Sequence, residues 1–174
     1  MSLLALTTND GLIIIQDSKT FELLNELRCG SYVTSLCFSQ DGTKLVSGLF
    51  DRNIKIWDVI TGECLNILEG NNDYILSVDF NPDASRVVSY SKNGRIMIWN
   101  SDTGEFIFTI PSNSSFLQSV CFSPDGSKII TGKKGPMLKM WDSNTGDVIP
   151  TTEEFNGSRI MRHCFSGETG GSYI

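Results

Sequence analysis

The chain has 174 residues, enough for a domain with a substantial core, and 40% of them are hydrophobic and 20% charged. This composition is typical of a globular protein and argues against a disordered or a fibrous chain. The net charge of −6 opposes broad binding to a nucleic-acid backbone, and no apolar run approaches the ~20 residues that a membrane-spanning helix needs.

The cysteines and the first residues bear on the compartment. The chain has five cysteines and no C-x-x-C pair, which predicts neither a disulfide framework nor a zinc site. The opening MSLLALTTNDG lacks the charged start and the long apolar run of a secretory signal. We therefore expect a reduced compartment, the cytoplasm or the nucleus. The cysteines are Cys29, Cys37, Cys64, Cys121 and Cys164.

From residue 33 onward the chain repeats itself with a period of 42 residues. Residues 33–68 read VTSLCFSQDGTKLVSGLFDRNIKIWDVITGECLNIL, and residues 75–110 and 117–152 align with them position by position. One column of this alignment holds all three tryptophans, Trp57, Trp99 and Trp141. A repeat of this length indicates the fold before any local pattern does.

Each repeat predicts four short strands. The first alternates apolar and polar residues, as in TSLCF, and is followed by SQDG, NPDA or SPDG, in which Asp, Pro and Gly favour tight turns. Three more short strands follow, which in the first repeat are KLVSG, IKIW and ECLNIL. Strands of about five residues that are joined by tight turns pair antiparallel, so we predict no helix in the repeats.

A sheet of four antiparallel strands cannot cover both of its faces alone. Sheets stacked around an axis bury these faces against one another, which predicts a β-propeller. The repeats resemble those of the WD-repeat (β-transducin-like) family, with V-x-S-V-x-F-S-P-D-G, a Ser or Thr at the end of the second strand, I-x-I-W-D and T-G. The resemblance extends over roughly residues 3 to 166. We predict one all-β propeller domain over residues 1–174, with four-stranded blades at 33–68, 75–110 and 117–152.

The two ends of the chain carry complementary parts of one more blade. Residues 3–27 match the second, third and fourth strands of a repeat, with Gln16 in the tryptophan column, and residues 158–166 match a first strand. We expect one composite blade, because a closed ring has no exposed strand edge. Three arrangements remain open: a closed ring of four blades, two chains in one ring of eight blades, and a partial member of a longer protein.

In the WD-repeat family a His, an Asp, a Ser or Thr and the Trp form a buried hydrogen-bonded set in each blade. The resemblance places Ser47, Ser89 and Thr131 in the hydroxyl column. The histidine column instead holds Cys29, Asn71 and Asn113, and the aspartate column holds Asp51, Asn93 and Gly135. No repeat has the full set. Because a buried unpaired carboxylate is costly, we expect Asp51 to be exposed or bonded to backbone N–H groups.

Two other columns carry residues that are typical of binding surfaces. Just before each first strand, at the rim of one face, stand Tyr32, Tyr74 and Phe116. On the same face, the loops that lead to the third strands hold Phe50, Lys92 and Lys134. Aromatic residues are enriched in binding hot spots, so we predict a partner with apolar side chains and some acidic character. In the alternative, the rings pack between blades and the lysines belong to ordinary solvated loops.

Catalytic chemistry has few candidates. The single histidine, His163, adjoins Cys164, but neighbouring side chains of a strand point to opposite faces. Glu153 and Glu154 lie in a loop, and no cluster has the spacing of metal ligands. We therefore expect no metal and no cofactor.

The resemblance implies a non-enzymatic scaffold that binds a protein or peptide on one face of the propeller. We expect neither a nucleic-acid nor a membrane partner, and a homodimer that closes an eight-bladed ring is one of the open arrangements. Two other functions are kept as alternatives. The chain could be a partial propeller without independent function, or a propeller that binds a small ligand or catalyses a reaction in its central channel.

Overall fold

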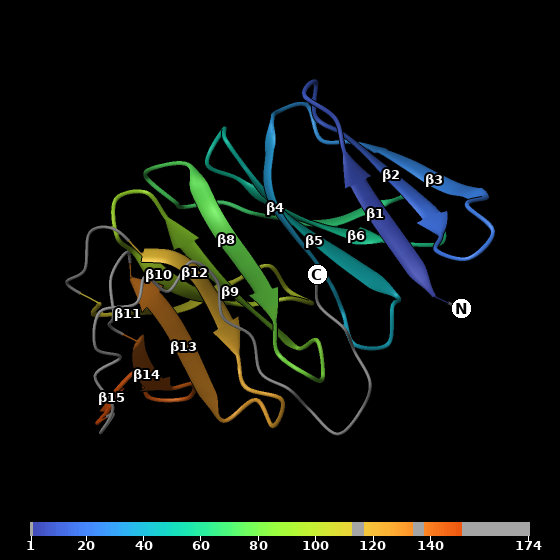
Figure 1. Ribbon diagram of the computed structural model, residues 1–174. Helices are drawn as coiled ribbons and strands as arrows, with labels where there is room; N and C mark the ends of the chain where they lie inside the picture. Colours follow the sequence, from blue (N-terminus) through green and yellow to red (C-terminus); the bar gives the residue numbers. More distant parts are fainter. Residues whose placement is uncertain (1, 113–116, 134–137, 151–174) are drawn as a thin grey trace.

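The computed structural model describes residues 2–112, 117–133 and 138–150. Within these residues all regular structure is β-strand, with fifteen strands in four antiparallel sheets that follow one another in chain order (Figure 1). The predicted all-β fold, built from sheets of three or four antiparallel strands, is confirmed. The described residues contain no helix with the length and hydrophobicity that spanning a membrane requires.

The first sheet has three strands and each of the others has four. The first contains β1 (Leu3–Thr7), β2 (Leu12–Asp17) and β3 (Leu23–Arg28). The second contains β4 (Val33–Phe38), β5 (Lys44–Leu49), β6 (Ile54–Asp58) and β7 (Cys64–Leu68). The third contains β8 (Ile75–Phe80), β9 (Arg86–Ser91), β10 (Ile96–Asn100) and β11 (Phe106–Ile110). The fourth contains β12 (Leu117–Phe122), β13 (Lys128–Lys133), β14 (Leu138–Asp142) and β15 (Val148–Ile149).

The turn after the third strand of the second sheet shows why these short strands end where they do. The Asp58 carboxylate accepts hydrogen bonds from the backbone N–H groups of Ile60 and Thr61, at 2.9 and 2.7 Å. Gly62 then has a φ of 74°, a left-handed conformation that glycine adopts without steric cost. The Asp-to-Gly stretch therefore closes a tight turn and returns the chain as an antiparallel strand.

Phe21 occupies the corresponding position of the first sheet, with a φ of 59° and a side chain that is 65% exposed. A bulky residue is strained in this conformation, and the exposed ring gains little from burial. We expect Phe21→Gly to raise the free energy of unfolding by about 0.5–1 kcal/mol, measured by urea denaturation. Gly104→Ala is the matched control, because its added methyl group would lie 3.5 Å from the nearest atom, Asn66 Oδ1, and φ is 76°. It should lower the stability, and the idea is wrong if both changes have the same sign.

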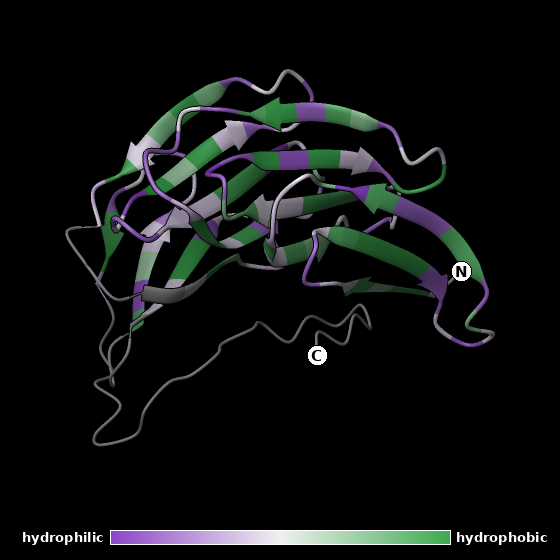
Figure 2. Ribbon diagram, turned by 90° about the horizontal axis from the view of Figure 1, so that it is seen from above, coloured by the Kyte–Doolittle hydropathy of each residue, from purple (hydrophilic) through white to green (hydrophobic). Residues whose placement is uncertain are grey.

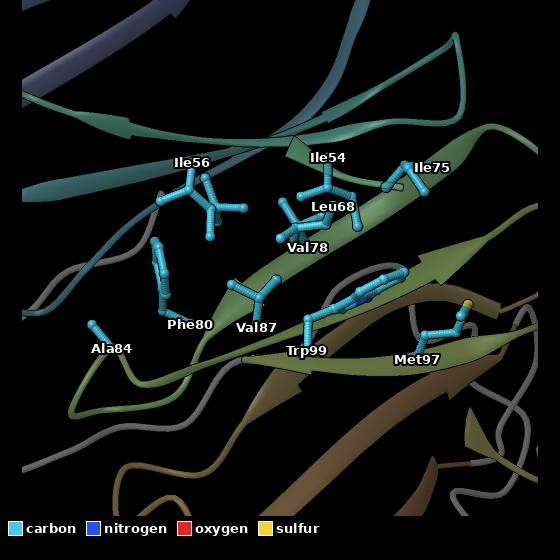
Figure 3. Close-up of a cluster of buried hydrophobic side chains, with 11 residues drawn as sticks. Ile54, Ile56, Leu68, Ile75, Val78, Phe80, Ala84, Val87, Met97 and Trp99 are labelled. Carbon is cyan, nitrogen blue, oxygen red and sulfur yellow. The ribbon is translucent and has the colours of Figure 1, made fainter. Parts of the chain in front are cut away.

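Successive sheets pack face against face. Ile54 and Ile56 on β6 and Leu68 on β7 are fully buried against Val78 and Trp99 of the third sheet (Figure 3). Two further apolar clusters join the first sheet to the second and the third to the fourth. The ribbon coloured by hydropathy shows apolar residues in every sheet (Figure 2), and the middle strands β5, β9 and β10 are buried along nearly their whole length. At ~25 cal/mol per Å² of apolar surface buried, this packing between sheets is the main source of stability.

The innermost strands β4, β8 and β12 lie side by side. Hydroxyl groups bridge them, since the N–H of Val78 donates to Ser35 Oγ and the N–H of Val120 donates to Ser77 Oγ, both at 3.2 Å. The second, third and fourth sheets are thus tied to one another by polar contacts at the centre as well as by apolar packing.

The composite blade remains a prediction. Residues 3–27 form a sheet of three strands in the order β1-β2-β3, without a first strand of the kind that opens the other sheets. The stretch expected to supply that strand, residues 158–166, lies outside the described residues, as does the end of the repeat at 117–152.

Candidate functional site

The tryptophan column and the hydroxyl column are structural. Nε1 of Trp57 donates to Ser47 Oγ and Nε1 of Trp99 donates to Ser89 Oγ, both at 2.9 Å. Nε1 of Trp141 donates to Thr131 Oγ1 at 3.1 Å. All six side chains are buried. A buried indole needs such an acceptor, so these pairs stabilise the sheets and leave no group for a ligand.

The columns for His and Asp differ between sheets. Cys29 is buried, and this burial raises the pKa of its thiol to about 11, which keeps it protonated and unreactive. Asn71 is buried, and its amide oxygen and nitrogen have no hydrogen-bond partner among the described residues.

Asp51 is exposed, as expected, and accepts a hydrogen bond from the N–H of Asn53 at 3.1 Å. Asn93 similarly accepts from the N–H of Arg95. Asn113 and Gly135 lie outside the described residues.

The two columns proposed for binding meet at the loops between the second and third sheets. The Phe50 and Tyr74 rings are stacked, with their centroids 4.6 Å apart and an interplanar angle of 20°. Lys92 Nζ lies 4.6 Å from the centroid of the Tyr74 ring. The N–H of Phe50 donates to the carbonyl oxygen of Tyr32 at 2.9 Å. We call these four residues, Tyr32, Phe50, Tyr74 and Lys92, the aromatic strip.

Local backbone geometry holds the strip in place. The N–H of Lys92 donates to the Tyr74 carbonyl, as that of Phe50 does to Tyr32, so each loop before a third strand is tied to the loop before a first strand. Asp73 caps the approach to β8, since its carboxylate accepts the N–H of Tyr74 at 2.9 Å. Arg52, with a φ of 79°, turns the chain after Phe50. The strip therefore belongs to four short loops, which these hydrogen bonds join in two pairs.

Exposure differs within the strip. Phe50 is 54% exposed and Tyr32 is 51% exposed, although both are large rings. Tyr74 is partly buried, and Lys92 is exposed. Contact with the Tyr74 side chain raises the pKa of Lys92, so its ammonium group stays charged at neutral pH. The Tyr74 ring thus packs between loops of two sheets, whereas the rings of Tyr32 and Phe50 have surface available for a partner.

Four of the six residues proposed for binding are therefore placed, and three of them touch one another. Phe116 and Lys134 lie outside the described residues, as do His163, Cys164, Glu153 and Glu154. Sequence reasoning missed Asp73 and Arg52, which shape two of the four loops. Asp73 could have been found from its place directly before the aromatic column.

A second polar cluster lies at the innermost strands and was not singled out from the sequence. Cys37 Sγ donates to Asp79 Oδ1 at 3.0 Å, and the N–H of Phe122 donates to Asp79 Oδ2 at 2.8 Å. Burial raises the pKa of Asp79 to about 6. Burial, together with the Asp79 charge, raises the pKa of the Cys37 thiol well above its usual range. The thiol is therefore a poor nucleophile.

The chemistry of the strip bears on the kind of ligand that it can hold. No group of three or more His, Cys, Asp and Glu side chains in the described ranges could hold a metal ion. The Lys92 ammonium beside the stacked rings repels a cationic ligand and attracts an anionic one. The rings themselves offer apolar surface with polar edges. The strip is therefore suited to an apolar side chain next to an acidic group.

Comparison with known proteins supports the repeat assignment. The family described as "WD domain, G-beta repeat" matches residues 21–58, 62–100 and 104–142 of this chain. The chain is 39% identical over 62 residues to the U3 small nucleolar RNA-associated protein 18 homolog of Arabidopsis thaliana. It is 37% identical over 59 residues to dynein assembly factor with WD repeat domains 1 of Xenopus laevis. It is 41% identical over 63 residues to the retinoblastoma-binding protein 5 homolog of Drosophila melanogaster.

These similarities extend over short parts of longer proteins. The matched segments amount to 36%, 33% and 36% of this chain, and to 11%, 14% and 13% of the three relatives in the same order. The relatives are named for different assemblies, so they share the repeat with this chain and point to no single partner.

Proposed function

This chain belongs to the WD40 (G-beta repeat) family, and from that premise we propose that it is a non-enzymatic scaffold that docks a protein or peptide. The docking surface is the face that carries the aromatic strip. The protein is proposed to act in the cytoplasm or the nucleus. This localisation agrees with the reduced cysteines and with relatives named for nucleolar RNA and for dynein assembly.

The observation that carries this proposal is the exposed pair Tyr32 and Phe50 beside the Tyr74–Lys92 contact. Large rings that remain about half exposed on bonded loops lose little conformational entropy when a partner covers them. Aromatic residues in such positions commonly supply most of the binding energy of an interface. The strip therefore supplies apolar anchors at one end and a single positive charge at the other.

The partner is expected to present an apolar side chain to Phe50 and a carboxylate to Lys92. A carboxylate gains from the ammonium group, and this gain falls as salt screens the pair. Nucleic acid is a poor candidate, because the chain carries a net charge of −6.

We would test the proposal by selecting short random peptides on the purified chain and measuring the affinity of the enriched sequences. Phe50→Ala combined with Tyr32→Ala should weaken binding about tenfold or more, because both anchors are lost. Lys92→Glu should weaken binding of acidic peptides, and this effect should shrink at high salt.

Ile60→Ala is the matched control. Ile60 is also a large exposed residue, at 82%, but it lies in the turn between β6 and β7, at the other end of the second sheet. This change should leave peptide affinity unaltered. If the strip variants bind as well as the unmodified chain while their melting temperature falls, the aromatic columns serve packing between sheets and the docking proposal is wrong.

The main alternative is a propeller that binds a small ligand or catalyses a reaction in its central channel. A thermal-shift screen with metal ions and common metabolites separates the two. Stabilisation by one of these compounds that persists in the strip variants would favour the alternative.

A further inference from the structure

The face of each sheet that packs against the next sheet in the chain, here called its forward face, carries two apolar residues of the third strand. In the first three sheets all six of these side chains are 0% exposed. They are Ile13 and Ile15, Ile54 and Ile56, and Ile96 and Ile98. On the fourth sheet the corresponding Leu138 and Met140 are partly exposed, and no following sheet is among the described residues.

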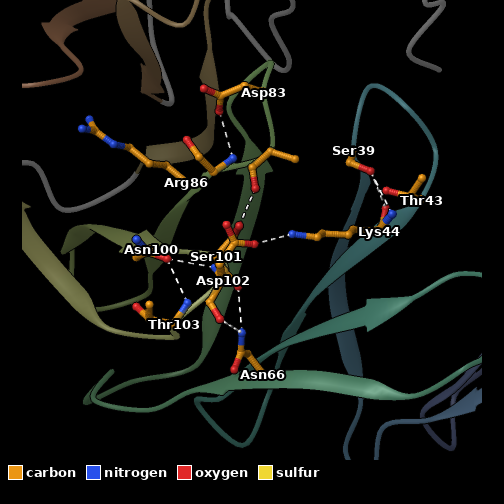
Figure 4. Close-up of polar contacts among 12 residues, drawn as sticks. Ser39, Thr43, Lys44, Asn66, Asp83, Arg86, Asn100, Ser101, Asp102 and Thr103 are labelled. Atoms are coloured by element: carbon orange, nitrogen blue, oxygen red, sulfur yellow. Dashed lines mark hydrogen bonds and ion pairs between the residues drawn. The ribbon is translucent and has the colours of Figure 1, made fainter.

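A polar contact accompanies the forward faces of the second and third sheets. Lys44, at the start of β5, donates through Nζ to Asp102 Oδ1 at 2.6 Å, in the turn of the third sheet (Figure 4). Arg86, at the start of β9, donates to Asn144 Oδ1 at 3.0 Å and to the Ser143 carbonyl at 3.3 Å, in the turn of the fourth sheet. In both cases the cationic side chain bonds to a side-chain acceptor in the turn before the last strand of the following sheet. This acceptor lies two residues after the Asn or Asp that begins the turn.

The residue types at these two positions agree in polarity at all three junctions between the described sheets. Leu3 of the first sheet corresponds to Lys44 of the second sheet. The turn that Leu3 would meet lies in the second sheet, where Ile60 corresponds to Asp102 of the third sheet. Where one sheet has an apolar residue at the first position, the next sheet has an apolar residue at the second. Where one sheet has a cation, the next sheet has a carboxylate or an amide. The fourth sheet has Lys128, which is exposed, at the start of β13. By analogy with Lys44 and Arg86, we expect Lys128 to bond to a side-chain acceptor in the turn of a following sheet.

The first sheet does not supply one. Its turn begins with Asp17, which accepts hydrogen bonds from the N–H groups of Lys19 and Thr20. The position two residues after Asp17, where the other turns hold the acceptor, is therefore occupied by Lys19. Lys128 and Lys19 would repel each other. The tryptophan that covers a forward face in the other sheets is also replaced, by Gln16. A second copy of this chain would offer the same mismatched sheet.

We propose that the forward face of the fourth sheet, Leu138, Met140 and Lys128, docks a further four-stranded sheet of the WD type. That sheet carries a tryptophan in its third strand and an Asp or Asn two residues into its last turn. It is neither the first sheet of this chain nor that of a second copy. Continuity with the three interfaces inside the molecule and the charge of Lys128 support this choice.

The test extends the full chain at its C-terminus with a copy of residues 69–110, which contain the third sheet and its Asp102. Oxidation of methionines by hydrogen peroxide, followed by mass spectrometry, then reports on burial. Met140 should become nearly as resistant as Met97, which is only 6% exposed, and the melting temperature should rise. Because Met140 does not touch the aromatic strip, failure here leaves the proposed docking of peptides untouched.

Two matched extensions test the role of the acceptor. A copy in which Asp102 is replaced by Lys, and a copy of residues 27–68, which carries Ile60 at that position, should both protect Met140 less. The population that is docked should fall about three- to tenfold with the lysine copy. Equal protection by all three copies would contradict the role of Lys128.

The unmodified chain supplies the remaining outcome. Light scattering should give the mass of one chain, with Met140 oxidised readily. A dimer in which Met140 is protected would show that a second copy covers this face, and would overturn the proposal in favour of the eight-bladed ring.

Discussion

Trp99→Ala is expected to lower the free energy of unfolding by about 3–5 kcal/mol, the range found for large aromatic residues in cores. Trp99 is 1% exposed and lies between the second and third sheets, against Ile54 and Leu68 (Figure 3). The change also leaves the buried hydroxyl of Ser89 without its donor. A domain is commonly stable by only 5–15 kcal/mol, so this one change removes a large share of the total.

Two further variants separate the contributions to this loss. Trp99→Phe retains much of the apolar contact but removes the hydrogen bond to Ser89, and should cost about 1–2 kcal/mol. Phe106→Ala removes only a ring that is 50% exposed and meets Trp99 edge-on, with centroids 5.7 Å apart. That change should cost about 1 kcal/mol.

Urea denaturation followed by far-UV circular dichroism measures all three variants. The order of destabilisation should be Trp99→Ala, then Trp99→Phe, then Phe106→Ala. A loss below about 1 kcal/mol for Trp99→Ala would mean that the sheets do not pack tightly around this ring, and the cluster in Figure 3 could not be the main source of stability.

The repeat made part of this structure predictable. Residues one period apart share a position in their sheets, so alignment put the tryptophans, the hydroxyl residues and the aromatic residues each in a column. The resemblance to the WD-repeat family then implied that the tryptophans and the hydroxyl groups pair. The turn chemistry was also readable, because Asp58 and Gly62 have counterparts in each repeat. Phe21 departs from this rule, and nothing in its local sequence signals the left-handed conformation that it adopts.

Contacts between sheets were harder to predict from the sequence. They join residues whose spacing along the chain depends on how each sheet is rotated against the next. Lys44 and Asp102 are 58 residues apart, which is no multiple of 42. Cys37 and Asp79 are one period apart, and only the closeness of β4 and β8 turns that column into a hydrogen bond. A one-dimensional pattern therefore identifies equivalent residues, while their partners follow from the packing.

Asp79 gives the second large expected effect, a gain in stability on mild acidification. The pKa of Asp79 is about 6 in the folded chain because of burial, against 3.8 for an ordinary aspartate. Between about pH 6 and pH 4 the folded state therefore binds more protons at this residue than the unfolded state does. The free energy of unfolding then rises as the pH falls through this window, by ~1.4 kcal/mol for each pH unit.

Other carboxylates act in the opposite direction. Hydrogen bonds from the Ser123 side chain and from Ser127 lower the pKa of Asp125 to about 2, so its contribution is present above about pH 4 and is lost as the pH falls toward 2. A comparison with Asp79→Asn removes this background, because both proteins share it. The asparagine keeps an oxygen that can accept the N–H of Phe122 but does not titrate.

The measurement is the difference in the free energy of unfolding between the unmodified chain and Asp79→Asn, from pH 7.5 to pH 4. The difference should shift in favour of the unmodified chain as the pH falls through about 6, and level off near pH 4. Cys37→Ser supplies a stronger donor to the carboxylate, lowers the pKa of Asp79 and should move the same window to lower pH. A difference that stays flat across the range would show that water reaches the Asp79 carboxylate, and that the contact between β4 and β8 does not hold it in a buried setting.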